Sequence, residues 1–551
     1  MTIRSLSQTE SMRKTIRTEV CIVGAGMAGL FLARQLTKFG LRTTIVESGA
    51  DLPDRSTTDL NEISDEYGRY KWPVTGRARG LGGSSSVWGG KLIPLAPGDL
   101  DRRPHIAAPE WPLGYETLVQ GLGEIEAFFH LDDGSYEEGA PPHSRTGLEL
   151  PRNDLNFAMR WAKWAGFRRG NVWSILEGAL SRHPLVDVWT DATVYDFTAD
   201  RLSRRVDTVL CRSRTGSTLS VHADHFVLAA GTIESTRLLL LLDETHDKRI
   251  FEGCDALGRY FQDHLDAHVG RLVPSDEASF NRLFGPRYLR LHRRSPHLEL
   301  TAEAQAADRV GSAFVHMTAD VSQNSTLATV KRIAKRLETR DYRALPSELR
   351  QAAIDPRLFS RFIARRVYHH TLFMPQDVDL NLRVCIEQAP RRDNRISLVH
   401  ATDRLGVRKV GLRWLPADID ERTFRACIDR FADFWQRYGI DRICRIEWAP
   451  CVRDTGGSIL EVAQDYAHPS GTTRMGSDPS QSVVDADLRC HHVPNLSVVG
   501  ASCFPSSGSA NPTLTVMLLS WRAARAIGNL LARPVAAVSR HRIGMKGVAS
   551  A

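Results

Sequence analysis

The sequence predicts an α/β protein with two domains, one built on a parallel sheet and one an α+β domain built on a mainly antiparallel sheet. Three observations support this prediction. A strand, a glycine-rich turn and an apolar helix follow one another near the N-terminus, and short alternating strands appear between about residues 186 and 230. Residues 266–446 then mix helical stretches with strand candidates such as LNLRVCIEQ, NRISLVH and KVGLRWL.

Composition excludes several classes of protein. The chain has 551 residues, 42% hydrophobic and 25% charged, which rules out disordered, collagen-like and disulfide-scaffold proteins. No apolar run approaches the roughly 18 residues that span a bilayer. The polar N-terminus lacks the apolar core of an export signal. Nine scattered cysteines without a CxxC pair predict reduced thiols, no metal site and a cytoplasmic protein.

The net charge of +8 is concentrated in three segments. Residues 331–370 carry 11 Lys and Arg against four acids, the tail from Arg533 carries four basic residues and no acid, and the first 20 residues carry a net +2. The rest of the chain therefore carries −5, which argues against nucleic-acid binding. Residues 331–370 favour a solvated helical hairpin, with docking to an acidic partner, anionic lipid or a neighbouring subunit as the alternative.

The first element is a strand over Glu19–Ile22 that ends in Val23 and opens into Gly24-Ala25-Gly26-Met27-Ala28-Gly29, before a helix over Leu30–Leu36. A second strand, Thr43–Val46, ends in Glu47, 18 residues beyond Gly29. This spacing is that of a Rossmann-like βαβ unit, whose glycines approach a pyrophosphate and whose acid holds a ribose. At this point FAD and NAD are both open.

Two further glycine sites follow. The run Arg77–Gly90 would let backbone N–H groups face a planar or anionic ligand, although a flexible surface loop is the plain alternative. The strand Phe226–Ala229 leads into a turn at Gly231 and a helix, which would add another contact to the same ligand.

The C-terminal block holds the candidate catalytic residues. His468 lies in HPSGTTRMG, and Asn511 precedes Pro512 at the start of a helix that runs to about Leu530. A lone histidine is more often structural than catalytic, and Asn511 could simply cap the helix. The same helix N-terminus would also stabilise a developing negative charge on a ligand ahead of it.

Together, the motifs GAGMAG, RGLGGSSSVWGG, AAGTIESTRLL, HPSGTTRMG and SANPTLT resemble the glucose-methanol-choline (GMC) oxidoreductase family, in particular its pyranose-oxidase-like and sugar-dehydrogenase branch. The resemblance spans about residues 19–530. It implies an FAD-binding domain over 18–265, including the β-meander near 186–230, and a substrate-binding domain over 266–446 that contains the basic helical insertion 331–370. Residues 447–532 would complete the FAD-binding domain.

The resemblance also implies a role for each motif. His468 would be the catalytic base and Asn511 its partner. Substrate contacts of the second domain do not carry over from the family, and Gln388 is expected there as a wall of the substrate site on its position alone. The expected reaction oxidises an alcohol, a secondary hydroxyl of a sugar or glycoside, to the ketone by proton abstraction and hydride transfer to flavin N5, with oxygen or another acceptor taking the electrons. The residues expected to contact FAD are Gly24, Gly26, Met27, Ala28, Gly29, Glu47, Arg79, Gly82, Gly83, Ser84, Ser85, Trp88, Gly89, Gly90, Val194, Ala230, Gly231, Gly500, Ala501, Asn511, Pro512 and Thr513.

Two departures from the family qualify these expectations. Val87 stands where pyranose oxidases carry the histidine that tethers the flavin, which predicts non-covalent FAD. Gly500-Ala501-Ser502 replaces a segment that often begins with Asp, and one acidic contact near the flavin is lost. A non-sugar alcohol substrate, a non-redox lyase of the same family and a non-catalytic flavin-binding protein are the alternative hypotheses.

Overall fold

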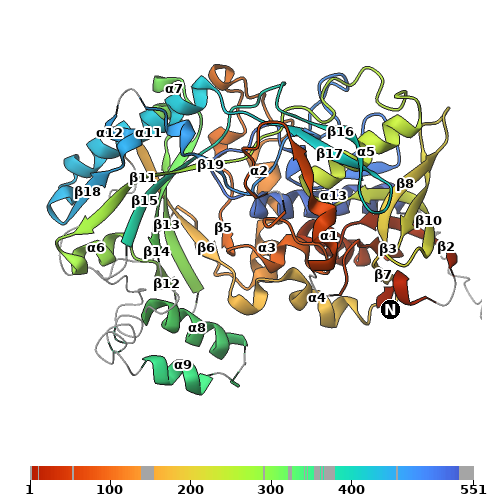
Figure 1. Ribbon diagram of the computed structural model, residues 1–551, viewed down its shortest axis with the longest axis horizontal. Helices are drawn as coiled ribbons and strands as arrows, with labels where there is room; N and C mark the ends of the chain where they lie inside the picture. The colour runs from red at the N-terminus through yellow and green to blue at the C-terminus, as the bar shows by residue number, and fades with distance from the viewer. Residues whose placement is uncertain are drawn as a thin grey trace, which may run out of the picture.

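The chain forms two layered bodies side by side, one built on a parallel sheet and one on an antiparallel sheet (Figure 1). The computed structural model describes residues 3–9, 12–51, 55–72, 74–137, 154–289, 292–320, 326–339, 342–343, 345–352, 360, 364, 379–454 and 457–532.

The first sheet has the strand order β1-β7-β3-β2-β10-β9-β8, with β20 also paired to β10. Strand β2 (Arg13–Val23) lies at its centre, parallel to β3 (Thr43–Val46) and β10 (Thr218–Leu228). The predicted βαβ unit is therefore the middle of this sheet. The remaining parallel strands are β1 (Ile3–Ser5), β7 (Val186–Thr190) and β20 (Leu496–Val498).

The meander predicted near 186–230 is shorter than expected at both ends. It consists of β8 (Thr193–Ala199), β9 (Val206–Arg212) and the first half of β10, all paired antiparallel. Strand β7 and the last residues of β10 are instead parallel strands of the main sheet. The burial of β10 changes along its length from alternating to continuous, as a strand covered on both faces requires.

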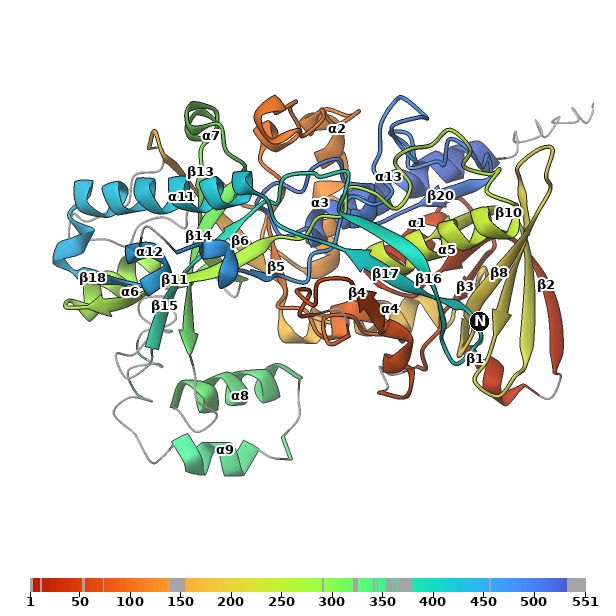
Figure 2. The same cartoon turned by 45° about the horizontal axis from the view of Figure 1, so that its top comes forward.

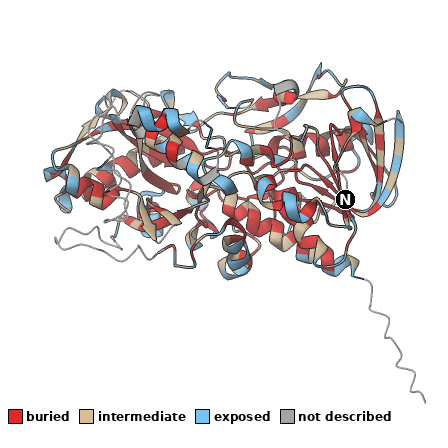
Figure 3. Cartoon of the chain, turned by 90° about the horizontal axis from the view of Figure 1, so that it is seen from below, coloured by how far each residue is buried: buried red, intermediate tan, exposed pale blue. Residues whose placement is uncertain are grey.

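Three helices flank the parallel sheet: α1 (Met27–Thr37), α5 (Gly231–Thr245) and α13 (Thr513–Leu531). Helices α1 and α13 pack together, and Ser520 Oγ donates a hydrogen bond of 2.8 Å to the carbonyl of Ala28. Figure 3 shows buried residues along the inner faces of both bodies. Three shorter helices pack on α1 and α13: α2 (Tyr115–Leu118), α3 (Leu122–Phe129) and α4 (Val172–Leu180).

The second sheet has the order β18-β11-β15-β14-β13-β6-β5, and every pair along it is antiparallel. Helix α11 (Asp418–Arg437) packs on β14 and β15 with Phe424, Phe431 and Phe434 buried. The strands are β5 (Lys91–Leu92), β6 (Phe157–Trp164), β11 (Leu265–Pro274), β13 (His292–Leu300), β14 (Ala313–Asp320), β15 (Asp379–Ile386) and β18 (Cys444–Trp448). Smaller elements of this body are β12 (Arg287–Leu289), β19 (Gln464–Asp465), α6 (Glu277–Phe284), α7 (Ala302–Asp308) and α12 (Pro450–Arg453).

The strands do not follow the predicted domain boundaries. Strands β5 and β6 come from the segment 18–265, yet they complete the second sheet. Strands β16 (Arg395–Thr402) and β17 (Arg408–Arg413) were expected in the second sheet, but they form a separate three-stranded sheet with β4 (Ile63–Asp65). The pairing of β17 with β4 joins Val410 to Ile63, and that of β13 with β6 joins Arg294 to Lys163, and strand patterns alone do not specify such distant partners.

The basic insertion contributes two helices, α8 (Thr326–Thr339) and α9 (Leu345–Ala352). Figure 2 shows them projecting from the antiparallel body, away from the parallel sheet. Arg332 and Arg336 of α8 both contact the carboxylate of Glu348 in α9, at 2.7 and 3.3 Å. Most of 353–370 lies outside the described residues. Among the helices that the structure describes, none combines the length and the apolar character needed to cross a membrane.

Candidate active site

A cavity of about 600 Å³ opens at the carboxyl ends of β2, β3, β10 and β20. Open α/β sheets bind their ligands at this edge. The three predicted glycine turns meet there, and the end of β6 and the segment Tyr466–His468 add walls from the other body. The cavity therefore lies where the parallel and antiparallel bodies come together.

The turn after β2 is a cradle without side chains. A Cβ on Gly24, which has φ +104°, would lie 2.7 Å from the carbonyl oxygen of Ala229, and a Cβ on Gly29 would lie 2.0 Å from that of Gly24. Both glycines keep the turn tight. A Cβ on Gly26 would meet nothing within 4 Å, although Gly26 lines the cavity. This bare backbone at the start of α1 fits the pyrophosphate of a dinucleotide.

Glu47 lies at the end of β3 and lines the cavity as predicted, but its carboxylate also holds the turns together. It accepts hydrogen bonds from the backbone N–H groups of Ala25, Gly49 and Gly80, at 2.8, 2.9 and 2.9 Å. One acid thereby fixes the first glycine turn against the loop that contains Arg79. Its place at the edge of the cavity is compatible with the expected ribose contact.

Most of the predicted contact residues line the cavity, and four do not. Those in the lining are Gly24, Gly26, Met27, Ala28, Glu47, Arg79, Gly83, Ser84, Trp88, Gly89, Gly90, Val194, Ala230, Gly231, His468, Gly500, Ala501, Asn511, Pro512 and Thr513. Gly29, Gly82, Ser85 and Gln388 lie outside it.

Gly82 and Ser85 act within the glycine-rich loop. The Gly82 N–H donates to the carbonyl of Ala25 at 2.9 Å, which joins the loop to the first glycine turn. Ser85 Oγ donates to the Gly82 carbonyl at 2.5 Å and accepts from the N–H of Val172 at 3.0 Å. Both residues shape the cavity wall from behind.

Gln388 is fully buried behind the cavity, so its placement does not support the expected substrate contact. Its amide oxygen accepts from Trp414 Nε1 at 2.7 Å and from the N–H of Asp263 at 3.2 Å, and its amide nitrogen donates to the Leu415 carbonyl at 3.3 Å. The side chain supports the start of β11 instead.

A buried ion cluster supports the glycine-rich loop. Arg79 donates to Ser48 Oγ and Asn61 Oδ1, at 2.9 and 2.7 Å, and lies 3.0 Å from the carboxylate of Glu234 at the start of α5. Burial alone would raise the pKa of Glu234, but Arg79, Arg237 and Arg77 lower it to about 2. Glu234 is thus a charged anchor that ties the second and third glycine sites together.

His468 is held by a second histidine that the sequence did not single out. His264 Nδ1 lies 2.9 Å from His468 Nδ1, and His264 Nε2 lies 2.8 Å from the carbonyl oxygen of Gly508. The backbone N–H of His468 donates to Asp263 Oδ1 at 2.8 Å. Burial, with smaller effects from His264 and Lys91, holds the pKa of His468 well below its ordinary value, so the imidazole is neutral at pH 7.

This chain of hydrogen bonds fixes which nitrogen of His468 carries the proton. The Gly508 carbonyl only accepts, so His264 Nε2 must be the donor, and burial lowers the pKa of His264 so that its Nδ1 is a lone pair. His468 Nδ1 is then the donor to His264 Nδ1. His468 Nε2 is left unprotonated, which is the state a proton acceptor requires.

Asn511 lies two residues before the start of α13. The helix begins at Thr513 with Pro512 at its N-cap, so the Asn511 side chain is not used as a cap. Asn511 lines the cavity, and its buried Oδ1 has no hydrogen-bond partner among the described residues. An unsatisfied buried polar atom at this place fits a bound cofactor or substrate that completes it.

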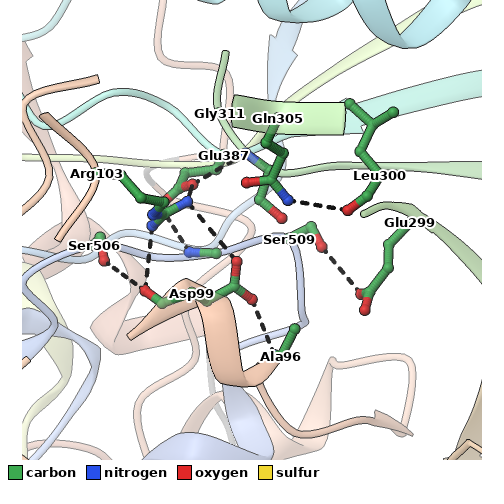
Figure 4. Close-up of polar contacts among 12 residues, drawn as sticks. Ala96, Asp99, Arg103, Glu299, Leu300, Gln305, Gly311, Glu387, Ser506 and Ser509 are labelled. Carbon is green, nitrogen blue, oxygen red and sulfur yellow. Dashed lines mark hydrogen bonds and ion pairs between the residues drawn. The ribbon is translucent and has the colours of Figure 1, made fainter. Parts of the chain in front are cut away.

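The segment before Asn511 is anchored to a buried ion cluster (Figure 4). Arg103 makes two hydrogen bonds to Glu387, at 2.5 and 2.8 Å, and Glu387 accepts from the N–H of Gly508 at 2.9 Å. Ser506 Oγ donates to the Asp99 carbonyl at 3.3 Å. The Gly508 peptide therefore links the His264–His468 pair on its oxygen side with the Arg103–Glu387 pair on its nitrogen side.

Four aromatic residues line the cavity, and one of them, Tyr466, lies against His468: Trp72, Trp88, Trp164 and Tyr466. The ring of Tyr466 lies 5.1 Å from that of His468, at 83°. Trp164 Nε1 donates to Ser295 Oγ at 2.8 Å and Trp88 Nε1 to the Gly170 carbonyl at 2.5 Å, which fixes both indoles. Fixed aromatic faces with hydrogen-bonded edges suit a ligand that is part apolar and part polar.

The comparisons with known proteins agree with this geometry. A family model described as GMC oxidoreductase matches residues 390–520, and one described as FAD binding domain matches residues 17–58. Paromamine 6'-oxidase of Streptomyces fradiae is 24% identical over 94% of this chain and 93% of its own length, and 6'''-hydroxyparomomycin C oxidase of Streptomyces lividus is 25% identical over the same shares. A crystal structure of formate oxidase has the same fold, with a TM-score of 0.59, 16% identity and coverage of 94% of this chain and 99% of that one. The chain therefore carries a GMC oxidoreductase domain and an FAD-binding domain, and it is an FAD-dependent enzyme that acts on CH–OH groups.

Proposed function

We propose that the chain oxidises a secondary hydroxyl of a sugar or glycoside to the ketone, with oxygen or another acceptor taking the electrons. The observation that carries the proposal is the unprotonated Nε2 of His468, fixed by His264 in the cavity that Asn511 also lines. Bound FAD would supply the hydride acceptor.

The residues of the chain handle the proton and the orientation of the alcohol. His468 Nε2 accepts the hydroxyl proton, and Asn511 hydrogen-bonds the alcohol oxygen so that the C–H bond faces the cofactor. The N-terminus of α13 favours negative charge at this end of the cavity. The glycine turn at Gly26 and the edge of β3 at Glu47 would hold the pyrophosphate and ribose.

The sugar as substrate class is supported by the aromatic walls and by the relatives. Trp72, Trp88, Trp164 and Tyr466 offer flat apolar faces to a polyhydroxylated ring. The two reported relatives are named as oxidases of paromamine and of 6'''-hydroxyparomomycin C. We propose that the FAD is bound non-covalently, because Val87, which lines the cavity, offers no atom for a tether.

We also propose that the basic insertion 331–370 contacts an acidic partner, an anionic lipid surface or a second copy of the chain. The support is its concentration of positive charge and the projection of α8 and α9 away from both sheets. Such contacts weaken with added salt.

The test of the catalytic proposal is anaerobic mixing of the holoenzyme with sugars, glycosides, and aliphatic and aromatic alcohols. A sugar or glycoside that bleaches the oxidised flavin, with a keto sugar as product, supports the proposal. Bleaching only by simple alcohols would overturn the sugar assignment, and product formed without any flavin reduction would indicate a non-redox reaction.

A further inference from the structure

We propose that the cavity contains a carboxylate-binding site made by Lys91, so that the substrate is an acidic sugar or another hydroxy acid. The proposal rests on the oxidation proposed above and names the class of its substrate. It is carried by a partly buried cation that lines the cavity and has no carboxylate within ion-pair distance among the described residues.

Lys91 is positioned by the loop that ends at Gly89 and Gly90, as the first residue of β5. It lines the same cavity as His468. Its Nζ lies 3.0 Å from His297 Nδ1 and 4.7 Å from the centre of the Phe314 ring. Strand β5 pairs with β6, so the ammonium lies against the antiparallel sheet and close to the catalytic end of the cavity.

The contact with His297 does not neutralise Lys91. His297 is fully buried, and burial, with the charge of Lys91, lowers its pKa to about 3. It is therefore a neutral ring that accepts from Lys91 through Nδ1, and its Nε2 lies 3.3 Å from Glu299 Oε2 without a hydrogen-bond partner among the described residues. A neutral acceptor orients the ammonium while leaving its charge in place.

Glu299, the carboxylate whose charge acts on Lys91, is already engaged. Glu299 receives Arg160 Nη1 at 3.2 and 3.4 Å on its two oxygens and Ser509 Oγ at 3.4 Å. Its negative charge is therefore matched by Arg160. Arg160 also lies 3.5 Å from the exposed carboxylate of Glu137, so both of these acids are paired with Arg160 and neither forms an ion pair with Lys91.

A desolvated cation without a counter-ion destabilises the free protein, and an anion that enters the cavity restores the balance. Burial lowers the pKa of Lys91 to about 8, so the side chain is still mainly charged at pH 7. Lys91 has hydrogen-bond donors beyond the one that meets His297. A carboxylate matches both the charge and the donors.

The experiment compares two ligands that differ by one charge. The wild-type holoenzyme, Lys91→Met, Lys91→Arg and the exposed-lysine control Lys248→Met are mixed with increasing concentrations of D-glucuronate or D-glucose under anaerobic conditions. Binding is read from the concentration that half-saturates the change in flavin absorption, whether that change is a shift of the oxidised spectrum or its bleaching. Lys91→Met should weaken glucuronate binding about tenfold or more and change glucose binding less than about twofold. Lys91→Arg should retain the preference for glucuronate, and Lys248→Met should match the wild type.

Equal affinities for the two ligands in the wild type, or an equal loss of both in Lys91→Met, would overturn the proposal. So would a shift of the flavin reduction potential in Lys91→Met without a change in ligand preference, since the cation would then serve the cofactor. Thermal unfolding of Lys91→Met, expected at or above the wild-type temperature, separates lost binding from lost folding. Binding and flavin reduction are measured separately. Tighter binding of glucuronate than of glucose without any flavin reduction would contradict the proposed oxidation but not the carboxylate-binding site.

Discussion

At the scale of single residues, the chemistry depends on burial keeping His468 neutral. Burial comes first among the causes that lower its pKa, followed by the charges of His264 and Lys91. A base whose pKa lies well below pH 6.5 is ready to accept a proton throughout the neutral range.

The pH dependence follows from that direction. Because the pKa of His468 is lowered, kcat/KM for an uncharged alcohol, which does not depend on the charge of Lys91 for binding, should stay constant as pH falls from 8 to 6.5 and decrease only where the pH nears the lowered pKa. Lys91→Met removes one of the charges that lower it, so the acid limb should move to higher pH in that variant. An acid limb centred at or above pH 6.5 in the wild type would contradict this account.

His264 is a positioning residue, and its two roles can be separated by substitution. In His264→Asn, the side-chain amide oxygen can lie near the place of His264 Nδ1 and accept from His468 Nδ1. In His264→Gln, the longer side chain places its amide near the former Nε2, next to the Gly508 carbonyl, and His468 Nδ1 loses its acceptor. We expect His264→Gln to lower kcat about 10- to 100-fold and His264→Asn to restore part of it, with KM changed less than about threefold.

Both variants should also move the acid limb upward, because they remove the positive charge that His264 gains when it is protonated at low pH, and that charge lowers the pKa of His468. Steady-state kinetics over a pH series measures both effects. Equal kcat in both variants and the wild type would show that His264 does not set the tautomer.

The sequence was sufficient to predict the residues that stand in contiguous motifs. The cavity contains His468, Asn511 and most of the glycine-turn residues, because each motif carries its own local geometry. His264 was not predicted, since its contact with His468 spans 204 positions. The run Gln262-Asp263-His264 just before an apolar strand was an available signal: all three residues are buried.

At the scale of elements, the turn into α1 separates a glycine needed by the fold from one needed by the ligand. Gly26→Ala adds a Cβ that meets no protein atom within 4 Å at an ordinary φ of −79°, so the fold should keep its stability. FAD binding should weaken at least about tenfold, because the methyl group enters the cradle. FAD titration of the apoprotein and thermal unfolding measure the two effects.

Gly29→Ala is the matched comparison. Its Cβ would lie 2.0 Å from the Gly24 carbonyl oxygen, so stability should fall by about 1–3 kcal/mol whether or not FAD is present. FAD affinity retained in Gly26→Ala would argue against a pyrophosphate at this turn.

The bounds of a helix or strand could be predicted from the sequence where the spacing of its apolar residues was regular. Thr43–Val46 is predicted and observed with the same bounds, and the C-terminal helix differs by one residue at each end. The meander was too long in the prediction, because β7 and the end of β10 read as strands equally well in either sheet. Only their partners decide between parallel and antiparallel pairing.

At the scale of the whole molecule, the antiparallel body closes without the basic insertion. Strand β14 ends at Asp320 and β15 begins at Asp379, and these two residues are register partners. Replacing residues 321–378 by a two-residue Asn-Gly turn should give a hairpin. FAD content and the rate of flavin reduction should stay within about twofold of the wild type.

The same variant tests the proposed docking role of the insertion. If the insertion binds anionic lipid, sedimentation with phosphatidylserine vesicles at low salt should be lost in the variant and reduced by high salt in the wild type. A large loss of flavin content in the variant would show that the insertion supports the fold instead.

The exchange of strands between the two bodies could not be predicted. Strands β5 and β6 leave the segment that builds the parallel sheet and complete the antiparallel one, and in doing so they bring Lys91 and Trp164 to the cavity. Such pairings depend on tertiary packing between distant segments, so both the substrate wall and the carboxylate-binding site became visible only in the structure.

The central claim is that His468, in the tautomer set by His264, removes the proton from an alcohol. The most direct measurement is the rate constant of flavin reduction in anaerobic stopped flow, with one substrate, for the wild type and His468→Ala. The account predicts a loss of about 10²- to 10⁴-fold in the variant with full FAD content. Flavin reduction at the wild-type rate in His468→Ala would contradict it.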